Sequence, residues 1–182
     1  VINAHPYSIK SNTGLNHWII DFVIQIDAQV NLDGANVKER FQDAFSQIYS
    51  GRVANDRFNS LVLAANLTWQ QIILVRAISS YLHQIQVPFS QTYMQSTLMR
   101  NANITHTLVR LFEARFNPKA QADASQITQL QEDIGLALEQ VSNLDEDRIV
   151  KYFLACIMAM LRTNYYQTDS DGQAHQYLSL KL

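Results

Sequence analysis

Glycine is scarce in this sequence, and its placement excludes the common nucleotide-binding loops. The chain has 182 residues and five glycines, which are Gly14, Gly34, Gly51, Gly135 and Gly172. A dinucleotide fingerprint or a P-loop needs several glycines within a few residues, because the backbone must approach the phosphates closely. The scattered glycines therefore predict that this chain binds no nucleotide through such a loop.

Cysteine occurs once, and the histidines lack the spacing of a metal site. Cys156 alone excludes an intrachain disulfide and fits a reducing compartment, so we expect a cytoplasmic protein. Its neighbours Phe153–Met158 are mostly apolar, whereas a nucleophilic thiol needs a cationic and exposed setting. We interpret Cys156 as core filling and the histidines as structural. The histidines are His5, His17, His83, His106 and His175.

Charge is also low, and it shows no strong bias of sign. Charged residues make up 16% of the chain, with 14 Lys+Arg against 16 Asp+Glu and no basic cluster. This excludes the electrostatic footprint of a nucleic-acid-binding protein. The longest apolar run, Tyr152–Leu161, is too short to span a membrane. Few surface charges indicate that another domain or subunit covers part of the molecule.

Residues 1–30 are predicted to form a β-hairpin. Tyr7–Lys10 has strand character, and Ser11–Gly14 supplies turn residues. After the turn, apolar and polar residues alternate, which is typical of a half-buried antiparallel strand. The apolar face of this second strand carries Trp18, Ile20, Phe22, Ile24 and Ile26.

Residues 31–168 are predicted to form about six or seven helices, so the fold class is mainly α. The expected N-caps are Asn36, Asp145, Ser90, and Thr68 with Gln71 completing a capping box. The helix from about Trp69 to Ile85 is apolar on nearly every face, which places it at the centre of the domain. Residues 169–182 end in a strand that could pair with the hairpin in one small antiparallel sheet.

A polar cluster directly precedes the apolar face of the second helix. It consists of Asn55, Asp56, Arg57 and Asn59. Such groups can bind an anion or an amino acid, or they can hydrogen-bond to one another and fix how two helices meet. We favour this structural lock, with Asn55 as the N-cap, because buried polar networks more often specify packing.

Two further arginines belong to the same set of candidate lock residues. Arg76 sits in the apolar third helix and must find a partner or extend to solvent, and Asp56 and Glu113 are both possible partners. Arg162 is expected at the C-terminal end of the seventh helix, where a cation is favoured.

Five motifs follow one another along the chain: Asn55–Trp69, Leu111–Pro118, Leu144–Arg148, Leu161–Gln167 and Tyr177–Leu182. Together they resemble the large bacterial NAD-dependent glutamate dehydrogenases. The resemblance covers almost the whole chain and is strongest from Asn55 onward. One departure is Gln70-Gln71, where the family is expected to carry a basic residue.

The resemblance implies a parent enzyme that converts L-glutamate and NAD to 2-oxoglutarate, ammonium and NADH. It places residues 1–30 at the end of an ACT-like regulatory domain. It places residues 169–182 in a strand leading to a catalytic core beyond this chain. No catalytic, NAD-binding or metal-binding residue carries over, so we expect this segment to be inactive alone. The expected partners are other domains of the same chain and, in the complete enzyme, further copies of it.

The sequence allows two alternative functions for this segment. The segment could be an effector-binding module that uses the Asn55–Asn59 cluster and Arg76. It could instead be an oligomerisation scaffold of the same enzyme. Neither nucleic acid nor membrane is an expected partner.

Overall fold

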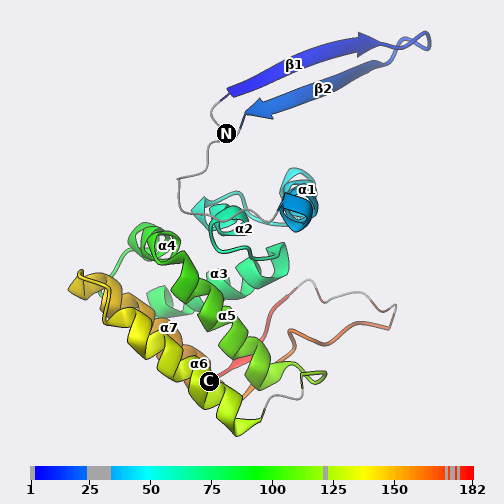
Figure 1. Ribbon diagram of the computed structural model, residues 1–182. Helices are drawn as coiled ribbons and strands as arrows, with labels where there is room; N and C mark the ends of the chain where they lie inside the picture. Colours follow the sequence, from blue (N-terminus) through cyan, green and yellow to red (C-terminus); the bar gives the residue numbers. More distant parts are fainter. Residues whose placement is uncertain (1–2, 24–33, 121–122, 171, 173–174, 176) are drawn as a thin grey trace. The chain divides into compact units, whose positions relative to one another are not determined.

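The computed structural model describes residues 3–23, 34–120, 123–170, 172, 175 and 177–182 (Figure 1). The chain divides into two compact units, Val1–Asn31 and Leu32–Leu182, which are described separately below. The described part contains seven α-helices, one 3-10 helix and four strands. The predicted mainly α fold is therefore confirmed.

The first unit contains an antiparallel hairpin of β1 (Asn3–Lys10) and β2 (Asn16–Val23). Tyr7 lies opposite Ile19, and Gly14 turns the chain with a φ of 79° that favours glycine. The first strand begins before the predicted Tyr7, and the apolar face of β2 is not half-buried, because Trp18 is 63% exposed and Ile20 is 45% exposed. Ile24 and Ile26 lie outside the described residues.

The second unit begins with α1 (Gly34–Tyr49). The prediction that Asn36 caps this helix is wrong, because the helix has already begun at Gly34. Its C-terminal end is as expected: Gly51 has a φ of 73°, and its N–H bonds to the Ile48 carbonyl at 3.0 Å. The left-handed conformation at this position closes the helix.

The next elements are η1 (Arg57–Ser60), α2 (Leu61–Ala64) and α3 (Trp69–Gln84). The predicted capping box of α3 is confirmed: Thr68 Oγ1 accepts from the Gln71 N–H, and Gln71 Oε1 accepts from the Thr68 N–H. Five apolar residues of α3 are buried, consistent with its predicted central position. They are Ile72, Leu74, Val75, Ile78 and Leu82.

The remaining helices are α4 (Gln91–Arg100), α5 (Ala102–Phe116), α6 (Ala124–Leu138) and α7 (Leu144–Ala159). Helix α5 packs against α4, α6 and α7 (Figure 1). Ser90 caps α4 as predicted. The predicted cap of α7 is wrong: Asn143 Oδ1 accepts from the N–H groups of Asp145 and Glu146, and Asp145 lies inside the first turn.

Two short strands follow α7. β3 (Arg162–Thr163) pairs antiparallel with β4 (Leu180–Lys181), forming a sheet separate from the hairpin. Among the described residues, the predicted pairing of the C-terminal strand with the hairpin is therefore not formed. A strand that lies close in sequence supplied the partner, and closing this short loop costs less entropy than closing one across the whole chain.

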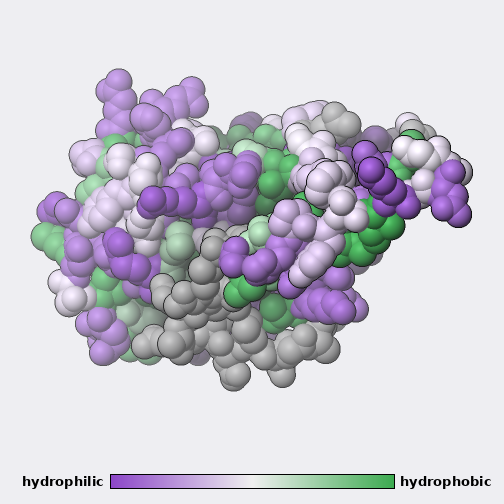
Figure 2. Space-filling model, turned by 90° about the horizontal axis from the view of Figure 1, so that it is seen from above, coloured by the Kyte–Doolittle hydropathy of each residue, from purple (hydrophilic) through white to green (hydrophobic). Residues whose placement is uncertain are grey.

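One hydrophobic core joins the helices of the second unit. Its largest fully buried side chains include Phe58, Phe112 and Phe153. In the view of Figure 2, hydrophobic residues reach the surface in separate patches between hydrophilic ones. None of the helices in the described ranges has the length and apolar character needed to cross a bilayer.

Candidate functional site

The candidate site starts where the chain enters η1. Asp56 has extended backbone angles, with φ −138° and ψ 179°, and its Oδ1 accepts from the Phe58 N–H at 3.0 Å. The N-cap of this turn is therefore Asp56 rather than Asn55. Phe58 is buried beside it, so the cap is anchored to the core.

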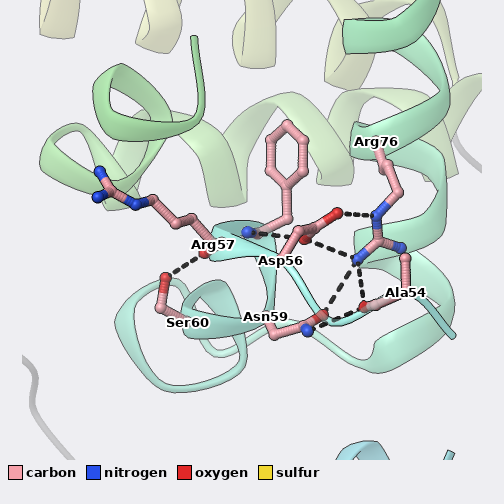
Figure 3. Close-up of polar contacts among 7 residues, drawn as sticks. Ala54, Asp56, Arg57, Asn59, Ser60 and Arg76 are labelled. Carbon is pink, nitrogen blue, oxygen red and sulfur yellow. Dashed lines mark hydrogen bonds and ion pairs between the residues drawn. The ribbon is translucent and has the colours of Figure 1, made fainter. Parts of the chain in front are cut away.

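Arg76 reaches this cap from α3 (Figure 3). Its Nε donates to Asp56 Oδ2 at 2.6 Å, and its Nη2 donates to Asp56 Oδ1 at 3.0 Å. Two parallel bonds between a guanidinium and a carboxylate are stronger and more directional than a single contact. The pair is largely shielded, since the side chains of Arg76 and Asp56 are 18% and 25% exposed.

Asn59 and the Ala54 carbonyl complete the cluster. Arg76 Nη2 also donates to Asn59 Oδ1 at 3.0 Å and, more weakly, to the Ala54 oxygen at 3.4 Å. Asn59 Nδ2 donates to the same Ala54 oxygen at 3.0 Å. Because these groups bond to one another, an incoming anion would have to displace Asp56 from Arg76.

The predicted site residues therefore divide into two groups. The structure brings Asp56, Asn59 and Arg76 together. Asn55 is exposed, and the exposed side chain of Arg57 points away from the cluster (Figure 3). Arg162 lies in β3, with an exposed side chain, instead of at the end of α7, because the helix stops at Ala159.

The choice between the two possible partners of Arg76 is also decided. Asp56 takes the guanidinium, whereas Glu113 Oε1 accepts from Gln71 Nε2 at 2.7 Å. Gln71 thus links the capping box of α3 to the C-terminal part of α5.

A second polar junction was missed by the sequence reasoning. Arg100 Nε donates to Glu146 Oε1, and Asn101 Nδ2 donates to Glu146 Oε2, each at 2.8 Å. The sequence predicts Asp145 as the cap of α7 and names no partner for Glu146. The burial of Glu146 required a specific partner, which the sequence pattern did not identify.

The other candidate reactive groups lie in structural settings. Burial raises the pKa of the Cys156 thiol to about 11, which is the opposite of nucleophile activation. His106 Nδ1 lies 2.9 Å from the Ala65 oxygen. In the described parts of the chain, no group of three or more His, Cys, Asp or Glu side chains is placed to hold a metal.

The described residues also do not fit an NAD site. The described strand pairs are antiparallel, whereas a dinucleotide fold places its phosphate loop between a parallel strand and a helix. Gly14, Gly51 and Gly172 have positive φ values of 73–79° in separate turns, and no described segment combines them in one loop.

Sequence comparison with known proteins gives the affiliation of the chain. Residues 53–118 match the family model "Glutamate dehydrogenase, helical motif 3". Residues 133–182 match "Bacterial NAD-glutamate dehydrogenase, catalytic domain". The chain corresponds to a segment of the NAD-specific glutamate dehydrogenases. The resemblance carried by the sequence motifs is thereby confirmed.

Three curated proteins named NAD-specific glutamate dehydrogenase match the whole chain. Identity is 40% over 186 residues for the Pseudomonas aeruginosa protein and 35% over 182 residues for that of Halomonas elongata. It is 37% over 190 residues for the Mycobacterium tuberculosis protein. The chain spans only 11–12% of the length of these relatives.

The two family models match successive parts of this chain, separated by residues 119–132. The catalytic-domain match begins at residue 133, inside α6, and includes α7, β3 and β4. The sequence reasoning had placed the core after residue 182, and the position of that boundary stays a prediction. Contacts between α5 and α7 therefore join the two matched regions.

Proposed function

We propose that this chain is a noncatalytic structural module of an NAD-dependent glutamate dehydrogenase. The complete enzyme would oxidise L-glutamate to 2-oxoglutarate and ammonium, with NAD accepting the hydride. NAD would bind elsewhere in the complete polypeptide, and the protein would be cytoplasmic. The names of the relatives support the reaction and the cofactor.

The closed state of the polar cluster is the observation that carries the structural role. Both Asp56 oxygens and Asn59 Oδ1 accept hydrogen bonds from within the cluster. A site for a substrate or an effector keeps polar groups directed at the ligand, whereas a lock uses them internally. This arrangement supports a lock between η1 and α3 and does not favour the effector-binding alternative.

Contacts with other domains of the same polypeptide, or with another subunit, are the second part of this role. The hairpin supports this proposal, because Tyr7, Ile9, Trp18 and Ile20 are each at least 45% exposed. An isolated hairpin is only marginally stable in water, so these apolar faces require cover.

Kinetics of the complete polypeptide test the proposal. Asp56→Asn should lower the melting temperature while leaving the KM values for glutamate and NAD within about twofold, because the lock touches neither reactant. A large loss of kcat in folded protein at an unchanged melting temperature would contradict the structural role. The isolated chain, shown to be folded by circular dichroism, should form no NADH from glutamate.

A thermal-shift screen tests the effector-binding alternative on the same protein. Amino acids and nucleotides should leave the melting temperature unchanged, since a ligand that binds the folded state would raise it. A ligand that raises the melting temperature of the wild type but not of the Arg76→Ala variant would show that the cluster is a binding site rather than a structural lock.

A further inference from the structure

The C-terminal end of α7 receives its cation from another helix. Arg115, in the last turn of α5, donates from Nη1 to the Ile157 oxygen and from Nη2 to the Met160 oxygen at 3.3 Å. The last carbonyls of a helix have no partner inside the helix, and the dipole favours a positive charge there. Arg115 satisfies both requirements with one planar group.

The two carbonyls that Arg115 binds lie on either side of the end of α7, so the contact affects the direction in which the chain leaves this helix. Ile157 is in the last turn of α7, whereas Met160 has already left the helix with φ −64° and ψ 129°. One guanidinium thus holds the chain on both sides of the point where it changes from helix to strand. An arginine has a rigid fork of donors, so the two bonds restrict the angle between the segments.

The chain beyond this point forms the small C-terminal sheet. The Leu161 N–H bonds to the Lys181 oxygen at 2.7 Å, and the Asn164 N–H bonds to the Ser179 oxygen at 3.3 Å. The direction in which the chain leaves α7 therefore decides where β3 and β4 lie.

The surroundings of Arg115 keep its geometry fixed. Its guanidinium carbon lies 5.0 Å from the centre of the Phe116 ring, and burial lowers the pKa of Arg115. A partly desolvated guanidinium that also lies over an aromatic ring has few alternative positions.

The contact also crosses between the two matched regions. Arg115 lies in the segment that matches helical motif 3, and both of its acceptors lie in the segment that matches the catalytic domain. We propose that Arg115 is a positioning residue, through which the helical motif sets the direction of the chain between α7 and β3, inside the region that matches the catalytic domain. Its effect on turnover rests on the proposed function, whereas its effect on β3 and β4 does not.

Hydrogen exchange in the complete polypeptide tests the positioning role directly. In Arg115→Ala, the Leu161 and Asn164 amides should exchange at least about tenfold faster, which corresponds to losing one charge-assisted hydrogen bond. Arg115→Lys should give a smaller but still measurable acceleration, since an ammonium keeps the positive charge but cannot reproduce the fork. Unchanged exchange at both amides in Arg115→Ala would overturn the proposal.

Arg100→Ala is the matched control, because Arg100 also contacts α7 but at its opposite end, through Glu146. This variant should leave exchange at Leu161 and Asn164 unchanged. Equal acceleration by both variants would mean that general loosening of α7 is responsible, and would also overturn the proposal. If Arg115→Ala fails to fold, Arg115→Lys and Arg115→Gln carry the same comparison.

Steady-state kinetics then separate positioning from simple stability. Arg115→Ala should lower kcat by about tenfold with KM for glutamate nearly unchanged, whereas Arg100→Ala should leave kcat unchanged below the melting transition. Accelerated exchange without any change in kcat would reduce Arg115 to a helix cap and overturn the positioning role. A wild-type polypeptide without glutamate dehydrogenase activity would contradict the proposed function, while the exchange experiment would still decide the role of Arg115 in the structure.

Discussion

Arg76 on α3 binds both carboxylate oxygens of Asp56, the residue that caps η1, at 2.6 Å and 3.0 Å. One aspartate thus performs two tasks, since its Oδ1 also accepts from the Phe58 N–H. The pairing connects a short turn to the central helix across 20 residues of sequence. It makes the orientation of η1 depend on α3.

Loss of this pair should destabilise the second unit. Arg76→Ala should lower the free energy of unfolding by about 2–3 kcal/mol, because it leaves a shielded carboxylate with only its backbone partner. Urea unfolding followed by circular dichroism measures the change. In a double-mutant cycle with Asp56→Ala, the coupling energy should be about 1–2 kcal/mol.

Arg57→Ala provides the matched control for this cycle. Arg57 lies beside Asp56 in sequence, but its exposed side chain points away from the cluster (Figure 3). The substitution should change the free energy of unfolding by less than about 0.5 kcal/mol. If Arg57→Ala were as destabilising as Arg76→Ala, the cluster would not be organised around Arg76.

Helix positions followed from local rules and could be predicted from the sequence. Thr68 with Gln71, and Ser90, lie in patterns whose effect on the backbone is decided within a few residues. The errors at Asn36 and Asp145 arose where several good capping residues stood close together. In such places the tertiary packing selects which one forms the first turn.

Pairings over long sequence distances could not be predicted in the same way. Asp56 and Glu113 were equally good partners for Arg76, because the sequence does not say which of the two side chains lies near Arg76 in space. Arg115 was missed because a cation was sought within α7 itself, whereas the actual one comes from α5. The sheet was misassigned for a similar reason, since alternation of apolar residues predicts a strand but not its partner.

Two fully buried threonines should respond in opposite directions to the same substitution. The Thr97 hydroxyl has no hydrogen-bond partner in the described part of the chain, whereas Thr105 Oγ1 donates to the Leu98 oxygen at 2.8 Å. Thr97→Val should raise the free energy of unfolding by about 1 kcal/mol, and Thr105→Val should lower it by about 1–2 kcal/mol. Urea unfolding of the two variants compares them directly, and a destabilised Thr97→Val would show that its hydroxyl does have a partner.

The start of α7 distinguishes the observed cap from the expected one. Asn143→Ala should lower the free energy of unfolding by about 1 kcal/mol, because two N–H groups lose their acceptor. Asp145→Ala should cost no more than about 0.5 kcal/mol, since it removes an exposed charge near the dipole and an exposed, loose ion pair with Arg148. Thermal unfolding of both variants measures the difference.

Two further variants isolate the capping effect at Asn143. Asn143→Asp keeps the accepting oxygen and should restore most of the stability. Tyr93→Phe removes the hydrogen bond from Asn143 Nδ2 to the Tyr93 hydroxyl and leaves the cap intact. A larger loss of stability in Asp145→Ala than in Asn143→Ala would show that Asp145, and not Asn143, caps α7.

High pH should weaken the packing of the segment that follows α7. Burial raises the pKa of Tyr166 to about 12, with a smaller contribution from the Glu113 charge, and burial also raises the pKa of Tyr165. A raised pKa means that the unfolded chain releases its proton first. The contribution of these tyrosines to stability is therefore fully present below the ordinary tyrosine pKa of about 10 and is lost as pH rises towards 12. Cys156, raised to about 11, should begin this loss at a lower pH.

Tyr166→Phe tests this pH dependence at a single position. The variant should lose less stability than the wild type between pH 10 and the highest pH at which unfolding remains reversible, because one titrating group is gone. At neutral pH it should be at least as stable, since the buried Tyr166 hydroxyl has no hydrogen-bond partner among the described residues. Urea unfolding over a pH series measures both effects. Identical pH slopes for the two proteins would mean that Tyr166 ionises as readily in the folded state as in the unfolded one.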